Sequence, residues 1–224
     1  MGGKSSGART NAAEVEGESG DVRGHIASCR ASHAALVGHL RELTDVDPAA
    51  PSRLLGWSIG HVLTHIARNA DGHVSMLDGC PQYPHGPEGR TADIERGAVR
   101  PWPELVDDVA TSAAALERRW ATHGDWDGTS RMLSGERPTG QLPLLRQREV
   151  EVHRVDLGLG YELGDMPADY VRRDLRLMGM LWTARQPMGM TPLPDAVLRL
   201  APSERLGWMM GRLDLDGVRP AGLF

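Results

Sequence analysis

Apolar residues recur about every three to four positions through most of this chain, and this helical spacing limits its fold more than any other feature. Few stretches alternate between polar and apolar residues as strands do. The spacing predicts five long helices, over residues 21–44, 58–78, 103–122, 141–159 and 167–185. Amphipathic helices bury their apolar stripes against one another. The chain is therefore expected to be mainly α, with a bundle of four to five helices.

The two ends of the chain differ from this bundle. Residues 1–19 are rich in Gly, Ser, Asn and Glu and contain no apolar segment, so we expect a disordered tail there and no secretory signal peptide. The bundle is expected over residues 20–185. Residues 186–224 are expected to form a short C-terminal appendage of mixed α/β character, with AVLRLAP as a strand and SERLGWMMGRL as a helix.

Two connections between the expected helices are predicted as loops. The segment GCPQYPHGPEG holds several prolines and glycines, which disfavour continuous regular structure, and Thr91 is expected to cap a short helix that ends near Ala98. Residues 123–139 also have the composition of a loop.

Composition excludes several classes of protein. The chain has 224 residues and only two cysteines, too few for a disulfide framework or a four-cysteine zinc site. Its net charge of −5 gives no basic surface for nucleic acid. Its apolar runs are far shorter than the roughly 20 residues that span a bilayer. We expect a cytoplasmic monomer or homodimer with reduced cysteines and no nucleic-acid or membrane partner.

The helix over residues 141–159 carries a Glu-x-x-x-His pair, Glu149 and His153. Residues four apart lie on one face of a helix, one turn from each other. Helical projection places this pair, together with Asp156, on or beside the apolar face, and it places Gln147, Glu151 and Arg154 on the other side. A carboxylate on a core-facing stripe is costly unless it is paired or binds a metal. The pattern leaves two interpretations: part of a metal site, or a buried Glu149–arginine pair with His153 hydrogen-bonded in the core.

A third metal ligand would come from another helix, because bundle cores build metal sites from facing helices. The helix over residues 58–78 offers three histidines. His61 projects away from the apolar stripe, toward solvent. His65 lies at the flank of the stripe, and His73 lies nearer its centre, where a core histidine is the alternative. Projection excludes His61 and leaves His65 and His73 open. We expect the remaining histidines to be structural or incidental.

Three blocks of sequence resemble a known family. They are GWSIGHVLTHIARNADGHVSMLDG, PQYPHGPEGRTADIERGA and LLRQREVEVHRVDLGLGY. In this order they resemble the mycothiol-dependent maleylpyruvate isomerase family, a member of the DinB-like superfamily of metal-binding helical bundles. The resemblance covers residues 20–185 and implies a DinB-like bundle.

The resemblance implies a metal site and a thiol cofactor. The ligands carried over by position are His65, Glu149 and His153. Two imidazoles and one carboxylate suit zinc and leave a coordination position open. The resemblance further implies that mycothiol, or a related low-molecular-weight thiol, binds there as a thiolate and adds to the double bond of a maleyl-type acid. Rotation about the resulting single bond and elimination of the thiol would give the trans isomer.

Two arginines also match the family pattern. Arg90 is implied as a residue of the cofactor-binding cleft, and Arg212, in MMGRLDLDGV, as a catalytic residue for a small acidic or electrophilic substrate. The alternative for each arginine is an ion pair with a nearby acidic residue. For Arg90 this is Glu88 or Glu95, and for Arg212 it is Asp214 or Asp216.

The C-terminal region is shorter than in the isomerases that the chain resembles. This departure keeps two alternatives open: a mycothiol S-transferase acting on an electrophilic small molecule, or a metal-binding DinB-like protein without catalysis.

Overall fold

The computed structural model describes residues 7–185 and 192–223, with side chains from Val22 onward. Contacts divide the chain into two compact units, Met1–Gly158 and Leu159–Phe224. Helix α1 (Gly7–Glu42) begins inside the tail expected over residues 1–19 and earlier than the first helix expected from residue 21. Residues 1–6 lie outside this description, so for them the tail stays a prediction.

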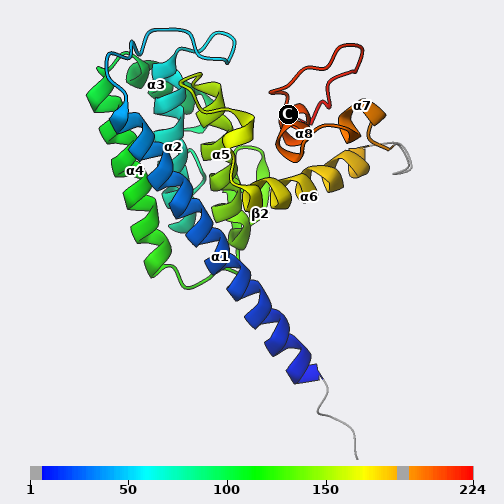
Figure 1. The fold of residues 1–224 in the computed structure, drawn as a ribbon. Coiled ribbons are helices and arrows are strands. Elements are labelled where there is room, and N and C mark those ends of the chain that lie inside the picture. Colours follow the sequence, from blue (N-terminus) through cyan, green and yellow to red (C-terminus); the bar gives the residue numbers. More distant parts are fainter. Residues whose placement is uncertain (1–6, 186–191, 224) are drawn as a thin grey trace, which may run out of the picture. The chain divides into compact units, whose positions relative to one another are not determined.

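The first unit is built from helices α1 (Gly7–Glu42), α2 (Ile59–Leu77), α3 (Gly86–Ala98), α4 (Trp102–Thr122) and α5 (Leu142–Asp156). Helices α1 and α2 each pack on both α4 and α5, which closes a ring of four helices, and α3 packs on α2. Figure 1 shows these four helices running alongside one another. The mainly α fold expected from the sequence is confirmed.

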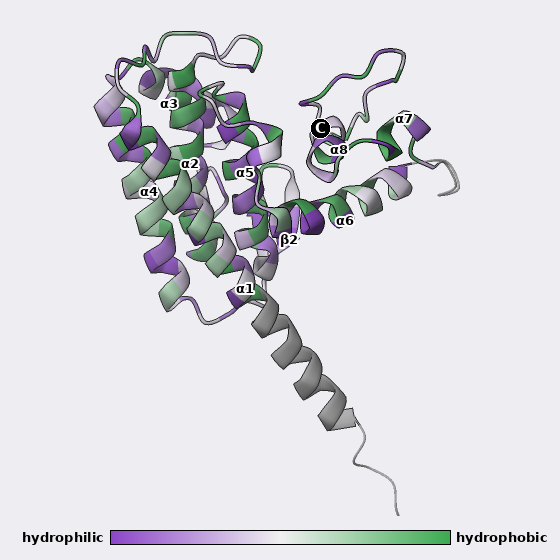
Figure 2. Ribbon diagram, in the orientation of Figure 1, coloured by the Kyte–Doolittle hydropathy of each residue, from purple (hydrophilic) through white to green (hydrophobic). Residues whose placement is uncertain are grey.

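The core of this unit lies where the apolar stripes of the helices meet. Figure 2 shows apolar and polar residues alternating around α2 and α4, as the helical spacing predicts. Fully buried side chains include Cys29, Leu63, Ile66, Leu105 and Leu116. Neither cysteine forms a disulfide: Cys29 lies in this core and Cys80 at the surface.

The N-terminus of α2 is fixed by local hydrogen bonds and by close packing. Ser58 is the N-cap: its side chain accepts a hydrogen bond from the backbone N–H of His61. Two residues on, Gly60 approaches α3 so closely that a Cβ atom there would lie 2.1 Å from the carbonyl oxygen of Ala98. A glycine is therefore needed at this contact.

Two segments predicted as loops hold regular structure. Helix α3 begins at Gly86, inside GCPQYPHGPEG, since Pro87 stands in its first turn, where a missing N–H costs nothing. Strands β1 (Thr129–Met132) and β2 (Gly135–Pro138) form an antiparallel hairpin within residues 123–139, with Met132 opposite Gly135. The strands are too short for their pattern to stand out in the sequence.

Helix α5 is buried on more sides than its apolar stripe predicts. Gln147, Glu151 and Arg154, expected away from the core-facing side, are all buried. The reason is that α5 packs on both α1 and α2, so its polar residues find partners inside the bundle. Gln147, for example, donates to the hydroxyls of Ser28 and Ser32 on α1.

The second unit contains α6 (Ala168–Arg185), α7 (Asp195–Leu198), α8 (Pro202–Met209) and the 3-10 turn η2 (Leu163–Asp165). Helix α6 packs on α8, where the rings of Trp182 and Trp208 lie 5.6 Å apart. The strand expected in AVLRLAP is wrong: its first three residues belong to α7, and its last, Pro202, begins α8. Arg205 on α8 donates to the carbonyls of Val197 and Leu198, which stabilises the C-terminal end of α7.

Within the described residues, none of the helices is both long enough and apolar enough to cross a membrane.

Candidate metal centre

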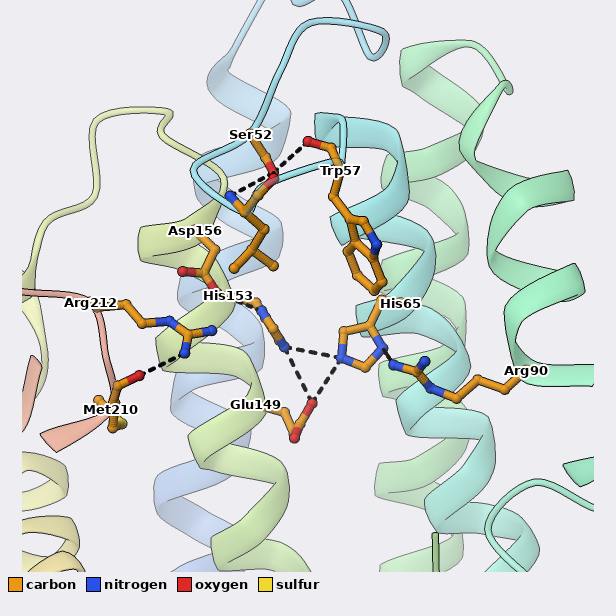
Figure 3. A network of polar contacts seen from close by, with 10 residues as sticks. Ser52, Trp57, His65, Arg90, Glu149, His153, Asp156, Met210 and Arg212 are labelled. Carbon is orange, nitrogen blue, oxygen red and sulfur yellow. Dashed lines mark hydrogen bonds and ion pairs between the residues drawn. The ribbon is translucent and has the colours of Figure 1, made fainter. Parts of the chain in front are cut away.

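Three side chains from α2 and α5 converge on one point in the first unit. The Nε2 atom of His65 lies 3.0 Å from the Nε2 atom of His153 and 3.0 Å from Oε2 of Glu149. The distance from Nε2 of His153 to the same carboxylate oxygen is 3.5 Å. Figure 3 shows the three side chains pointing toward one another. The structure thus brings together the residues that the resemblance implies as ligands.

Burial differs among the three side chains. His65 is 7% exposed and His153 is 12% exposed, whereas Glu149 keeps 31% of its side chain exposed. The group therefore lies in the bundle but reaches solvent through Glu149. Oε2 of Glu149 contacts the two histidines, so the carboxylate is not taken up by the buried arginine pair considered as the alternative.

The outer nitrogen of His153 has a carboxylate partner. Its Nδ1 atom lies 2.8 Å from Oδ2 of Asp156, whose side chain is 2% exposed. An ionised carboxylate only accepts hydrogen bonds, so Nδ1 of His153 carries the proton and donates it. Nε2 is the atom then left to face His65 and Glu149. Carboxylate partners of this kind fix the tautomer and the ring orientation of metal-ligating histidines.

The surroundings shift the pKa values of all three groups. Burial lowers the pKa of His65. Burial also acts to lower the pKa of His153, but hydrogen bonds to Asp156 and Glu149 outweigh it and raise that pKa. Burial acts to raise the pKa of Glu149, yet hydrogen bonds from His153 and His65 hold it well below its usual value. Glu149 is therefore a carboxylate at neutral pH.

Trp57 and the loop before α2 form the apolar side of the group. The indole of Trp57 meets the His65 ring edge-on, with ring centroids 5.5 Å apart. Two hydrogen bonds hold the loop: Ser52 Oγ donates to the carbonyl of Trp57 within it, and the N–H of Arg53 donates to the carbonyl of Asp156 on α5. This anchoring holds the indole over the histidine, as Figure 3 shows for the labelled residues.

Arg90, from α3, lies on the other side of His65. Its Nη2 atom is 3.1 Å from Nδ1 of His65, and its guanidinium lies over the ring of Tyr83, 5.6 Å from the ring centroid. Glu95, one of the acidic partners considered for Arg90, contacts His61 instead. The structure therefore places Arg90 beside the three converging side chains.

Arg212 belongs to the second unit. Its Nη1 atom donates to the carbonyl of Met210, 2.7 Å away (Figure 3). Gly211 precedes it with a positive φ of 69°, so the chain turns sharply at this point. The role of Arg212 as a catalytic residue stays a prediction.

The other two histidines of α2 lie apart from the group. His61 contacts Ser58 and Glu95 at the start of the helix, as its projection predicts. His73 is fully buried, and neither of its ring nitrogens has a hydrogen-bond partner among the described residues. Of the two histidines left open by projection, His65 is the one that meets Glu149 and His153.

Sequence reasoning missed one residue that positions α2 and α5 against each other. Arg146 is fully buried, and it donates from α5 to the carbonyl of Ile66 and the side chain of Asn69, both on α2. It also donates to Nε2 of His33 on α1. The available signal was an arginine three residues before Glu149, but its acceptors lie in distant parts of the sequence.

The chemistry of these donors fits a divalent cation. Two imidazole nitrogens and a carboxylate oxygen, all within 4.8 Å of one another, form the one such group found among the described residues. Mixed nitrogen and oxygen ligands of this kind suit zinc and other first-row metals. Three protein donors are one fewer than tetrahedral zinc needs, which leaves a position for a small molecule.

Comparison with known proteins points to one family. Two solved structures match the chain, a mycothiol-dependent maleylpyruvate isomerase and a variant of that enzyme with one histidine replaced by alanine. Each is 21% identical, covers 85% of this chain and 89% of its own, and has a TM-score of 0.72, which shows a shared fold. No curated protein matches the chain. The model of the mycothiol maleylpyruvate isomerase N-terminal domain matches residues 29–158, more than half of the chain and most of the first unit. The chain therefore belongs to the family of the mycothiol maleylpyruvate isomerase N-terminal domain.

Proposed function

We propose that this protein is a metal- and mycothiol-dependent enzyme that converts a maleylpyruvate-type acid from the cis to the trans isomer. In this reaction the thiol sulfur and a proton add across the double bond, the new single bond rotates, and elimination breaks the same carbon–sulfur bond. The thiol is regenerated, so no oxidant or reductant is needed. Since neither cysteine forms a disulfide, the proposal includes a reducing, cytoplasmic location.

The observation that carries this proposal is the convergence of His65, Glu149 and His153 in a chain of this family. A carboxylate and two imidazoles that meet within hydrogen-bond distance form a ready donor set for a cation, here zinc. Asp156 supports the same assignment, because it holds the proton of His153 on the outer nitrogen.

The chain's own residues have distinct tasks in this proposal. Bound at the three ligands, a divalent cation would lower the pKa of a thiol enough to deprotonate it. Trp57 covers one side of His65 and limits the access of water there. Arg90 stands beside His65 with a guanidinium suited to a carboxylate of the substrate or the thiol. Arg212 is proposed as the second arginine that binds the acidic substrate.

Product analysis tests the reaction. We would incubate the zinc-loaded protein with mycothiol and maleylpyruvate and separate the products by chromatography with mass detection. A new isomer of unchanged mass, formed only when mycothiol is present and without net loss of thiol, supports the isomerase. A stable thioether between mycothiol and the electrophile would identify a mycothiol S-transferase instead. If neither product forms, the chain is a metal-binding protein without this catalysis.

Metal analysis tests the site separately from the reaction. The purified protein is expected to hold close to one equivalent of zinc, and His65→Ala and Glu149→Gln are expected to lose it. His85→Ala is the matched control, because His85 is exposed and makes no side-chain capping bond to α3. Full zinc retention in both ligand variants would contradict the site assignment.

A further inference from the structure

The two candidate histidine ligands have opposite partners at their outer nitrogens. Nδ1 of His153 faces the Asp156 carboxylate at 2.8 Å, and a carboxylate accepts hydrogen bonds. Nδ1 of His65 faces Nη2 of Arg90 at 3.1 Å, and a guanidinium has donors only and stays protonated in proteins. The same atom in the two rings is therefore a donor in one and an acceptor in the other.

These partners fix two different tautomers. A neutral imidazole carries one N–H and one acceptor nitrogen. His65 accepts from Arg90 at Nδ1, so its proton is on Nε2, where it donates to Oε2 of Glu149 at 3.0 Å. His153 donates from Nδ1, so a lone pair is available on its Nε2. Nε2 therefore carries the proton in His65 and a lone pair in His153.

Metal binding demands the same tautomer from both histidines. A ligating Nε2 must offer a lone pair, and the proton of the ring is then on Nδ1. His153 already meets this demand. In His65 the metal-binding tautomer would place the Nδ1–H directly against the N–H of Arg90, so that two donors face each other. A dication close to the guanidinium adds repulsion between like charges.

Resting on the proposed function, we propose that Arg90 is a metal-dependent positioning residue. It holds His65 in the tautomer that cannot ligate, it is displaced from Nδ1 when the cation binds, and it then offers its guanidinium to a carboxylate ligand. Tyr83 keeps the displaced arginine nearby, because the guanidinium already lies over its ring.

This arrangement couples the cation to acidic ligands. A carboxylate that binds Arg90 draws it away from His65 and so favours the metal-binding tautomer. By linkage, the metal raises the affinity for the carboxylate by the same factor. The protein would therefore bind its acidic ligand tightly only after the metal is in place.

Nitrogen-15 NMR of the histidine rings tests the inference on the unmodified protein. We would strip metal from the labelled protein with a chelator, record long-range proton–nitrogen spectra, add zinc, and assign the signals with His65→Ala and His153→Ala. The expected result is that His65 changes from the Nε2–H to the Nδ1–H tautomer on zinc binding, while Nδ1 of His153 keeps its proton throughout. A His65 ring that is Nδ1–H before zinc is added would overturn the inference.

Zinc affinity gives a second readout that does not depend on turnover. Arg90→Met removes the competing donor, and the variant protein is expected to bind zinc about tenfold more tightly. This factor corresponds to the loss of one charge-assisted hydrogen bond. Arg96→Met removes a positive charge from the same helix, where Arg96 pairs with Asp93, and is expected to change affinity less than twofold. If the two substitutions change zinc affinity equally, Arg90 acts only through its positive charge, and the inference is overturned.

The acidic probe for the coupling is maleate. It is expected to tighten zinc binding in the unmodified protein and not in Arg90→Met; the same tightening in both proteins would overturn the coupling. The outcomes also separate this inference from the function on which it rests. A protein that binds no zinc contradicts both, whereas zinc binding to a His65 ring already in the Nδ1–H tautomer contradicts only the role of Arg90.

Discussion

The imidazole of His153 and the carboxylate of Asp156 lie one turn apart on α5, joined by a 2.8 Å contact between Nδ1 and Oδ2. Asp156 is buried, and the contact points away from Glu149 and His65, so it leaves Nε2 free to meet them. One helix therefore supplies two candidate ligands and the group that sets the tautomer of one of them.

Asp156→Asn is expected to weaken zinc binding by about 10- to 100-fold, because partners of metal-ligating histidines typically contribute this much. The amide no longer fixes the proton on Nδ1 with a charged acceptor. Zinc affinity, measured by competition with a chromogenic chelator, checks this. Asp107→Asn, an exposed position on α4, is the control. Equal affinities for the two variants would show that Asp156 has no such role.

Zinc affinity is expected to fall as the pH falls. Burial acts to lower the pKa of His153, but its bonds to Asp156 and Glu149 raise it above the usual 6.5, so the ring becomes protonated already above that pH. A protonated His153 must lose a proton to ligate, which makes zinc binding weaker by up to about tenfold per pH unit below the raised pKa. Titrations between about pH 8 and pH 6 check this. An affinity that stays constant over this range contradicts the prediction.

His73→Leu is expected to reduce the loss of stability in acid. Burial, with Arg146 nearby, lowers the pKa of His73 to about 3 in the folded protein, whereas the usual value is 6.5. The unfolded chain therefore binds the proton first, and the stability that is present above pH 6.5 is lost as the pH falls toward 3. Between about pH 7 and pH 5 this amounts to about 2 kcal/mol.

Urea unfolding of the native protein and His73→Leu at these two pH values measures the difference. His85→Leu, at an exposed position, is the control and should show the native pH dependence. If His73→Leu also keeps the full pH dependence, the proton uptake belongs to another group, such as His33, whose pKa burial lowers to about 4.

Gly60→Ala is expected to lower the free energy of unfolding by about 1–3 kcal/mol, the usual cost of overpacking. The added methyl group would meet the carbonyl oxygen of Ala98, and neither backbone can move without shifting α2 against α3. Gly38→Ala on α1 has nothing within 4 Å of the new methyl group and is expected to stabilise by about 0.5–1 kcal/mol. Chemical unfolding checks both; a Gly60→Ala protein of native stability would contradict the close approach.

The parts of the site that obey local rules could be predicted from the sequence. Glu149, His153 and Asp156 share one helix, so their spacing alone places them together. His65 could not be separated from His73 in this way, because both lie near the apolar stripe of α2 and the difference depends on where α5 packs. The resemblance to a family, rather than periodicity, favoured His65.

Features that depend on contacts between distant parts of the chain were missed, because the spacing of residues within one helix does not reveal which helix packs against it. Arg146 has no local partner, and its acceptors come from α1 and α2. The burial of Glu151 follows from α5 lying between two helices, which its own pattern does not reveal. In the second unit, the sequence of α7 suits a strand, but carbonyl bonds to Arg205 stabilise a short helix there.

His65 and Glu149 are 84 positions apart in the chain, yet their side chains touch. A cation held by both would tie these two points as a cross-link does, closing a long loop of the unfolded chain and reducing its conformational entropy. Because Cys29 and Cys80 form no disulfide, the metal would then be a removable cross-link, and a chelator would be expected to loosen the whole bundle as well as the site.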